Sequence, residues 1–158
     1  SDVCSSDLGG TVLLLEGDSL LSEPSFIDRL QPVNELKPSL HFGAPWNHTG
    51  LHMMQTPSRQ WSENVTGLAA TGVELILTLS NHAPQAGHPL VPVLNITEDD
   101  AAYGRYTEDF DLFWDPDSGA EPFLQLLADV ISGHIIPKTV TTKNIAFQIT
   151  RGLTGVSL

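Results

Sequence analysis

The chain has 158 residues, 41% of them hydrophobic, and its 7 Lys and Arg against 19 Asp and Glu give a formal charge of −12. This composition favours a folded domain with a hydrophobic core over a disordered chain. It disfavours nucleic acids and anionic membrane surfaces as partners, because both require clusters of cationic side chains.

The first eight residues, 1–8, are polar and look like translated adapter sequence, so we expect one α/β domain over residues 9–158. Cys4, the only cysteine, lies in that segment, and no disulfide or thiolate site is therefore expected. No apolar run has the length of a membrane span, and the start lacks the pattern of a signal peptide. We therefore expect a cytoplasmic protein without a membrane partner.

In the first half of the chain, apolar runs predict strands at 11–16 and 51–55, with a short helix at 22–30 and an extended linker at 31–49 between them. Residues 60–71 place apolar side chains at helical spacing, and Gly72 follows as a C-terminal stop.

In the second half, continuous apolar runs predict buried strands at 73–79 and 90–96. A short helix capped by Thr97, an acidic loop at 108–117, a helix over 118–131 and a last strand at 144–150 follow. Together these elements predict an α/β fold in which a mostly parallel, Rossmann-like open sheet is flanked by helices. Strands 51–55, 73–79 and 90–96 are expected side by side.

Polar residues that follow the strands are the candidates for a site, because open α/β sheets bind ligands at strand ends. Asn81, His82 and His88 follow strand 73–79, and the two histidines are candidates to converge on a metal or a substrate group. The alternative is that both are solvated loop histidines. Asp109 and Asp111 can chelate a hard cation together, or they belong to an acidic surface loop.

Thr56, Ser58 and Asn64 surround a strand–helix junction, where exposed N–H groups bind carboxylates. Alternatively, Ser58 only caps the helix. Right-handed crossover geometry predicts that Thr56 and Ser58 lie close to Asn81 and His82.

Four segments, in their order and spacing, resemble the C-terminal region of the altronate/galactarate dehydratases: GLHMMQTPS at 50–58, TGLAATG at 66–72, VPVL at 91–94 and EDFD at 108–111. The resemblance covers roughly residues 50 to 150. The chain departs from the family pattern at Gln55, where the family has aspartate, at His82, where it has arginine, and at Asn95, where it has lysine.

The resemblance implies a sugar-acid hydro-lyase that removes water from an aldonate or aldarate to give a 2-keto-3-deoxy acid. Such chemistry needs a base, an acid and concentrated positive charge, usually a divalent metal such as iron, magnesium or manganese, and no nucleotide cofactor. It implies Asp109 and Asp111 as metal ligands, His82 or Lys143 as base and His88 as acid. For Lys143, the alternative is a solvated lysine.

The departures favour a different class of protein, a catalytically silent acid-binding or assembly subunit that keeps the fold. Family members also carry a further N-terminal part. We therefore expect a fragment of a longer protein, a homo-oligomer, or a chain that needs a partner chain.

Overall fold

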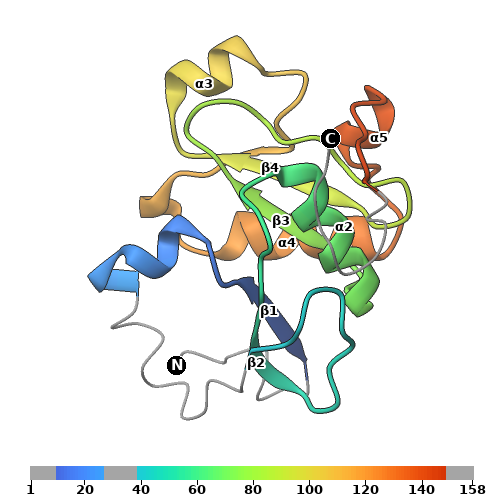
Figure 1. Ribbon diagram of the computed structural model, residues 1–158. Coiled ribbons are helices and arrows are strands. Elements are labelled where there is room, and N and C mark those ends of the chain that lie inside the picture. Colours follow the sequence, from blue (N-terminus) through green and yellow to red (C-terminus); the bar gives the residue numbers. More distant parts are fainter. Residues whose placement is uncertain (1–9, 27–38, 149–158) are drawn as a thin grey trace. The chain divides into compact units, whose positions relative to one another are not determined.

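The computed structural model describes residues 10–26 and 39–148 (Figure 1). The prediction for residues 1–8, and parts of those for 22–30, 31–49 and 144–150, lie outside the described residues. The predicted α/β class is confirmed, because the described residues form both helices and strands, and the strands pair only in parallel. The chain divides into two compact units, with residues 10–26 and 39–73 in unit 1 and residues 74–148 in unit 2.

The sheet of unit 1 joins β1 (Thr11–Leu15) to β2 (Gly50–Met54) in parallel. Leu40 lies on the other edge of β2, where its N–H donates to the Met53 carbonyl at 2.7 Å. Strand 51–55 was predicted to continue the sheet of strand 73–79. That prediction is wrong, because β2 and β3 belong to different hydrogen-bonded sheets in the described part of the chain.

The helix predicted over 60–71 is confirmed as α2 (Trp61–Thr71). Gly72 ends it in the left-handed region, with φ of 94°, a conformation that favours glycine. Gly67 is needed for packing, because a Cβ added there would lie 2.2 Å from the ring of Phe42. In the same unit, a 3-10 turn, η2 (Ser19–Ser22), follows β1.

The sheet of unit 2 has the order β3–β4–β5, and all three strands are parallel. The strands are β3 (Ile76–Leu79), β4 (Val93–Thr97) and β5 (Leu112–Phe113). The predicted parallel pairing of the 73–79 and 90–96 strands is therefore confirmed. The acidic segment 108–117 was interpreted wholly as a loop, but it contributes β5 and the 3-10 turn η3 (Pro116–Ser118).

The helices of unit 2 are α3 (Asp100–Arg105), α4 (Glu121–Ile131) and α5 (Lys138–Thr141). The prediction that Thr97 caps the helix after β4 is wrong. Asp99 is the cap, because its carboxylate accepts the Ala102 N–H at 2.6 Å. Thr97 stays buried at the end of β4, and its hydroxyl oxygen accepts the N–H of Asp99.

The strand predicted at 144–150 is absent from the described residues 144–148, where Ile145 makes a single bridge with Gly87. The core of unit 2 gathers around β4, and Val93, Leu94 and Phe110 have no exposed surface. Among the helices of residues 10–26 and 39–148, none combines the length and the apolar character required to cross a membrane.

Candidate functional site

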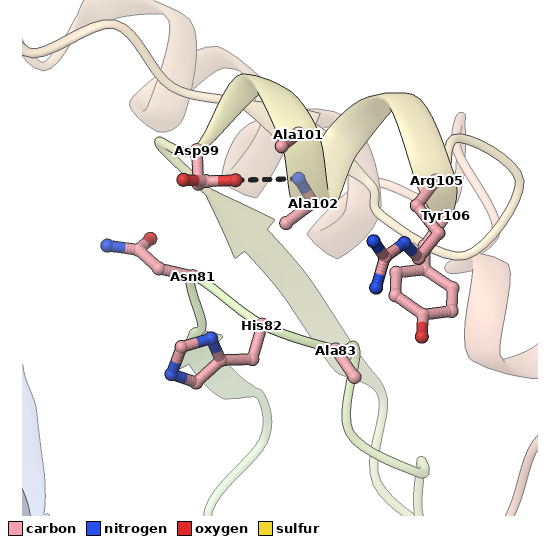
Figure 2. A pocket seen from close by; sticks show the side chains of 8 residues that line it. All are labelled: Asn81, His82, Ala83, Asp99, Ala101, Ala102, Arg105 and Tyr106. Atoms are coloured by element: carbon pink, nitrogen blue, oxygen red, sulfur yellow. Dashed lines mark hydrogen bonds between the residues drawn. The ribbon is translucent and has the colours of Figure 1, made fainter.

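A pocket of about 300 Å³ lies in unit 2 between the loop that follows β3 and the helix that follows β4 (Figure 2). These two strands are adjacent and parallel, so the segments after their carboxyl ends meet at one edge of the sheet. The pocket is lined by Asn81, His82, Ala83, Asp99, Ala101, Ala102, Arg105 and Tyr106.

The loop wall of the pocket begins with a turn that Ser80 stabilises. The Ser80 hydroxyl donates to the Ala83 carbonyl at 2.9 Å and accepts the His82 N–H at 3.3 Å. The Asn81 amide donates to the Glu98 carboxylate at 3.2 Å. The His82 side chain is exposed, and its ring has no hydrogen bond with the residues that the structure describes. His82 is therefore available to a ligand.

The helix wall places a cation and a phenol next to each other. Figure 2 shows the side chains of Arg105 and Tyr106 at the C-terminal end of α3, across from Ala83. Within the described residues, the Arg105 guanidinium has no ion pair or hydrogen bond. At the opposite end of α3, the Asp99 carboxylate lines the pocket while it caps the helix. The pocket thus carries a cationic end and an anionic end.

Beneath the loop wall, a hydrogen-bond network centres on Asn95, which is fully buried on β4. Its Oδ1 accepts the Thr78 hydroxyl at 2.6 Å and the Gln85 N–H at 2.8 Å. Its Nδ2 donates to the Gln85 carbonyl at 3.0 Å. The network ties the loop between β3 and β4 to the central strand.

His88 differs from His82, although both come from the same loop. Its side chain is only 8% exposed, and its Nδ1 accepts the Leu90 N–H at 3.2 Å. Burial lowers the pKa of His88 below its ordinary value, which favours the neutral ring. The pocket lining includes His82 but not His88.

Asp111 connects β4 to the start of α5. Its Oδ2 accepts the Asn95 N–H at 2.7 Å, and its Oδ1 accepts the Lys138 N–H at 2.8 Å. Burial raises the pKa of Asp111, against the opposing effect of these hydrogen bonds and of the Lys138 charge. The carboxylate therefore has a structural role whether or not it also binds a ligand.

The predicted metal pair fits a cation poorly on this geometry. Both oxygens of Asp111 already accept backbone N–H groups, so the Asp109 carboxylate is the only one of the pair without a hydrogen bond among the described residues. Among the described residues, no group of three or more His, Cys, Asp or Glu side chains is arranged to hold a metal ion. A metal at this pair stays a prediction, and we derive no chemical step through it.

The remaining predicted residue of unit 2, Lys143, is exposed just beyond α5. Its φ of 59° lies in the left-handed region, which is unusual for a residue with a side chain. It does not line the pocket. Its predicted role as a base stays a prediction.

Thr56, Ser58 and Asn64 belong to unit 1. The Ser58 hydroxyl donates to the Glu63 carboxylate and accepts the Gln60 N–H at 3.1 Å, so it stabilises the first turn of α2. Asn64 is buried, and its amide donates to the Ser58 carbonyl at 3.3 Å. Its Oδ1 has no hydrogen-bond partner among the described residues.

Thr56 is half-buried beside Gly17, where an added Cβ would lie 2.9 Å from its hydroxyl oxygen. Because Asn81 and His82 belong to unit 2, their predicted proximity to Thr56 and Ser58 stays a prediction.

Comparison with known proteins identifies no family: no protein-family model matches the chain, and no curated protein matches it. The pocket also contains three polar residues that sequence reasoning did not select, Asp99, Arg105 and Tyr106. The signal that indicates them is their place on the first helix after a central parallel strand, at the edge where ligands bind.

Proposed function

We propose that the chain binds a sugar acid in the pocket between the β3–β4 loop and α3. The observation that carries this proposal is that Arg105, Asn81 and His82 line one pocket at the carboxyl end of two parallel strands. Arginine binds carboxylates through two parallel hydrogen bonds, and Arg105 has no carboxylate partner among the described residues.

The distribution of cations in unit 2 supports Arg105 as the residue that binds the acid group. Its Lys and Arg residues are Arg105, Lys138 and Lys143. The Lys138 ammonium donates to the Thr107 carbonyl, and Lys143 is exposed away from the pocket. In a chain with a charge of −12, an anionic ligand needs such a local cation.

The rest of the pocket suits the hydroxyl groups of a sugar chain. The Asn81 amide and the Tyr106 hydroxyl both donate and accept hydrogen bonds, and the Asp99 carboxylate accepts them. A ligand with a carboxylate at one end and hydroxyls along its length matches a pocket with one cation and several neutral or anionic polar groups.

A second candidate function is the hydro-lyase reaction of the altronate/galactarate dehydratase type. The observation that favours it is that His82 and Tyr106, two groups able to transfer protons, line the same pocket. Here His82 takes the proton next to the carboxylate, and Tyr106 donates to the departing hydroxyl group. The divalent metal that such chemistry usually uses stays part of this proposal.

Calorimetric titration with altronate, galactarate and related acids tests the binding. We expect Arg105→Ala to weaken binding by about tenfold to a hundredfold, the range that a hydrogen bond between charged groups contributes. Arg59→Ala is the matched control, because Arg59 is an exposed arginine of unit 1. If Arg105→Ala binds as tightly as the natural chain, this pocket is not the site.

An assay for the 2-keto-3-deoxy acid separates the two functions, and His82→Ala tests the loop wall of the pocket. We expect His82→Ala to lose binding while the fold is retained, because the side chain is exposed. If the natural chain binds an acid but forms no product with or without Mg²⁺, Mn²⁺ or Fe²⁺, the hydro-lyase candidate is wrong and the binding function stands. If it binds none of the acids, both are wrong.

A further inference from the structure

The loop between β3 and β4 is fixed to the sheet by one side-chain amide. The Asn95 carboxamide accepts the Gln85 N–H at 2.8 Å and donates to the Gln85 carbonyl at 3.0 Å. It therefore pairs with both backbone groups of one loop residue, as the facing residue of an antiparallel hydrogen-bonded pair does. Gln85 follows Asn81 and His82 closely in the chain, so this contact fixes the loop just beyond the pocket wall.

Asn95 Oδ1 also contacts β3. It accepts the Thr78 hydroxyl at 2.6 Å in addition to the Gln85 N–H. A second attachment lies further along the loop, where the Gly87 N–H donates to the Asn144 carbonyl at 2.7 Å. The loop is thus attached at two positions, Gln85 and Gly87, and both follow the pocket residues in the chain.

The strand that carries Asn95 also leads directly into the opposite wall of the pocket. β4 ends at Thr97, and Asp99 then caps α3, which carries Arg105. Asn95 therefore connects the loop wall to the strand from which the helix wall extends.

We propose that Asn95 is the positioning residue of this pocket. Its side chain is fully buried and does not line the pocket, so it acts on a ligand only through the loop that bears Asn81 and His82. This inference rests on the proposed function for its effect on binding, but the contact with Gln85 is testable without any ligand.

Asn95→Asp is the sharpest substitution, because aspartate has nearly the same shape but its ionised carboxylate cannot donate to the Gln85 carbonyl and repels that oxygen. This repulsion should displace Gln85 from the strand even though an acceptor for its N–H remains. Thr78→Val is the matched control, because it removes a buried hydrogen bond to the same Oδ1 without touching the loop. We expect both variants to unfold at lower temperature. We expect only Asn95→Asp to bind the sugar acid about tenfold more weakly and to exchange the Gln85 amide hydrogen at least about tenfold faster.

Three outcomes separate this inference from the proposed function. If the Gln85 amide is as protected from exchange in Asn95→Asp as in Thr78→Val, the inference is wrong, whether or not the chain binds a sugar acid. If exchange accelerates but the affinity of a binding chain is unchanged, the loop does not position the site and the inference is again wrong. If the natural chain binds no sugar acid while exchange still accelerates, the proposed function fails and the contact is upheld.

Should Asn95→Asp fail to fold, Asn95→Thr replaces it, because threonine suits a strand and retains a hydroxyl but cannot pair with both groups of Gln85. The same exchange and affinity changes are expected. Full protection of the Gln85 amide in this folded variant contradicts the inference.

Discussion

Strands β1 and β4 have five residues each and parallel neighbours, but they are buried to very different extents. β1 reads TVLLL, yet none of its residues is buried, and Val12 is exposed, with 39% of its surface accessible. β4 reads VLNIT and is completely buried, including its polar residues Asn95 and Thr97.

Position in the sheet explains this difference better than hydropathy. β4 pairs with a strand on both edges, and α5 covers it where the Thr139 hydroxyl donates to the Val93 carbonyl at 3.0 Å. In the described residues, β1 has a strand partner on one edge only. The polar groups of β4 are tolerated in the interior because each is hydrogen-bonded. An apolar run therefore predicts a strand without predicting that the strand is central.

The same substitution in both strands gives the largest expected contrast. Leu94→Ala in β4 removes a fully buried side chain, and we expect it to cost about 2–5 kcal/mol of unfolding free energy. Leu14→Ala in β1 removes a half-buried side chain and should cost about 1 kcal/mol. Amide hydrogen exchange of β4 and β1 measures the two effects separately. Equal costs would contradict the ranking of the strands.

Removing the carboxylate that links β4 to α5 should have the next largest effect. Asp111→Ala leaves the N–H groups of Asn95 and Lys138 without their acceptors, and we expect a loss of about 2–3 kcal/mol. Asp109→Ala is the control, because the Asp109 side chain has no hydrogen bond within the described residues, and its effect should stay below about 1 kcal/mol. Denaturant unfolding gives both values.

The same pair of variants tests the predicted metal. A cation held jointly by Asp109 and Asp111 would raise the melting temperature of the natural chain, and chelation would remove that increase. We expect Mn²⁺ to have the same effect on the melting temperature of the natural chain and on that of Asp109→Ala. A metal-dependent increase lost in that variant would establish the metal site and revise the structural role given to Asp111.

The smallest effect concerns the pH dependence of stability beside β4. Because folding lowers the pKa of His88 from 6.5, the unfolded chain binds the proton first as pH falls. Stability should therefore decrease as pH falls below about 6.5, until the folded chain also takes up the proton. His88→Asn retains an acceptor for the Leu90 N–H but does not titrate. Its stability should change less between pH 7.5 and 5.5, and an identical slope would contradict the assignment.

Much of the fold was predictable from periodicity. Helix α2 and its stop at Gly72, and the parallel pairing of β3 with β4, follow from apolar spacing and from glycine conformation. β5 was not predictable, because its two residues lie within an acidic segment. They form a strand only because they pair with the edge of β4 that β3 does not occupy. The partner of β2 was also missed, because a continuous apolar run does not specify which neighbour it meets.

The site was predictable only where it follows a strand directly. Asn81 and His82 follow β3, and the strand-end rule selected them. Arg105 and Tyr106 lie at the far end of α3, the helix that follows β4. The strand-end rule therefore selects them only when the length of α3 is known. Asp111 was interpreted from the sequence as a metal ligand. In the structure its carboxylate accepts two backbone N–H groups, and a sequence does not show such partners.

The registers of the two sheets also set the chain entropy that each pairing costs. Thr11 pairs with Gly50, whereas Ile76 pairs with Val93, so the residues paired in unit 1 are more than twice as far apart along the chain. Each doubling of a closed loop costs about 0.6 kcal/mol of additional closure entropy. The sheet that buries less of its apolar surface thus also closes the longer loop, and both terms leave β1 and β2 with the smaller margin of stability.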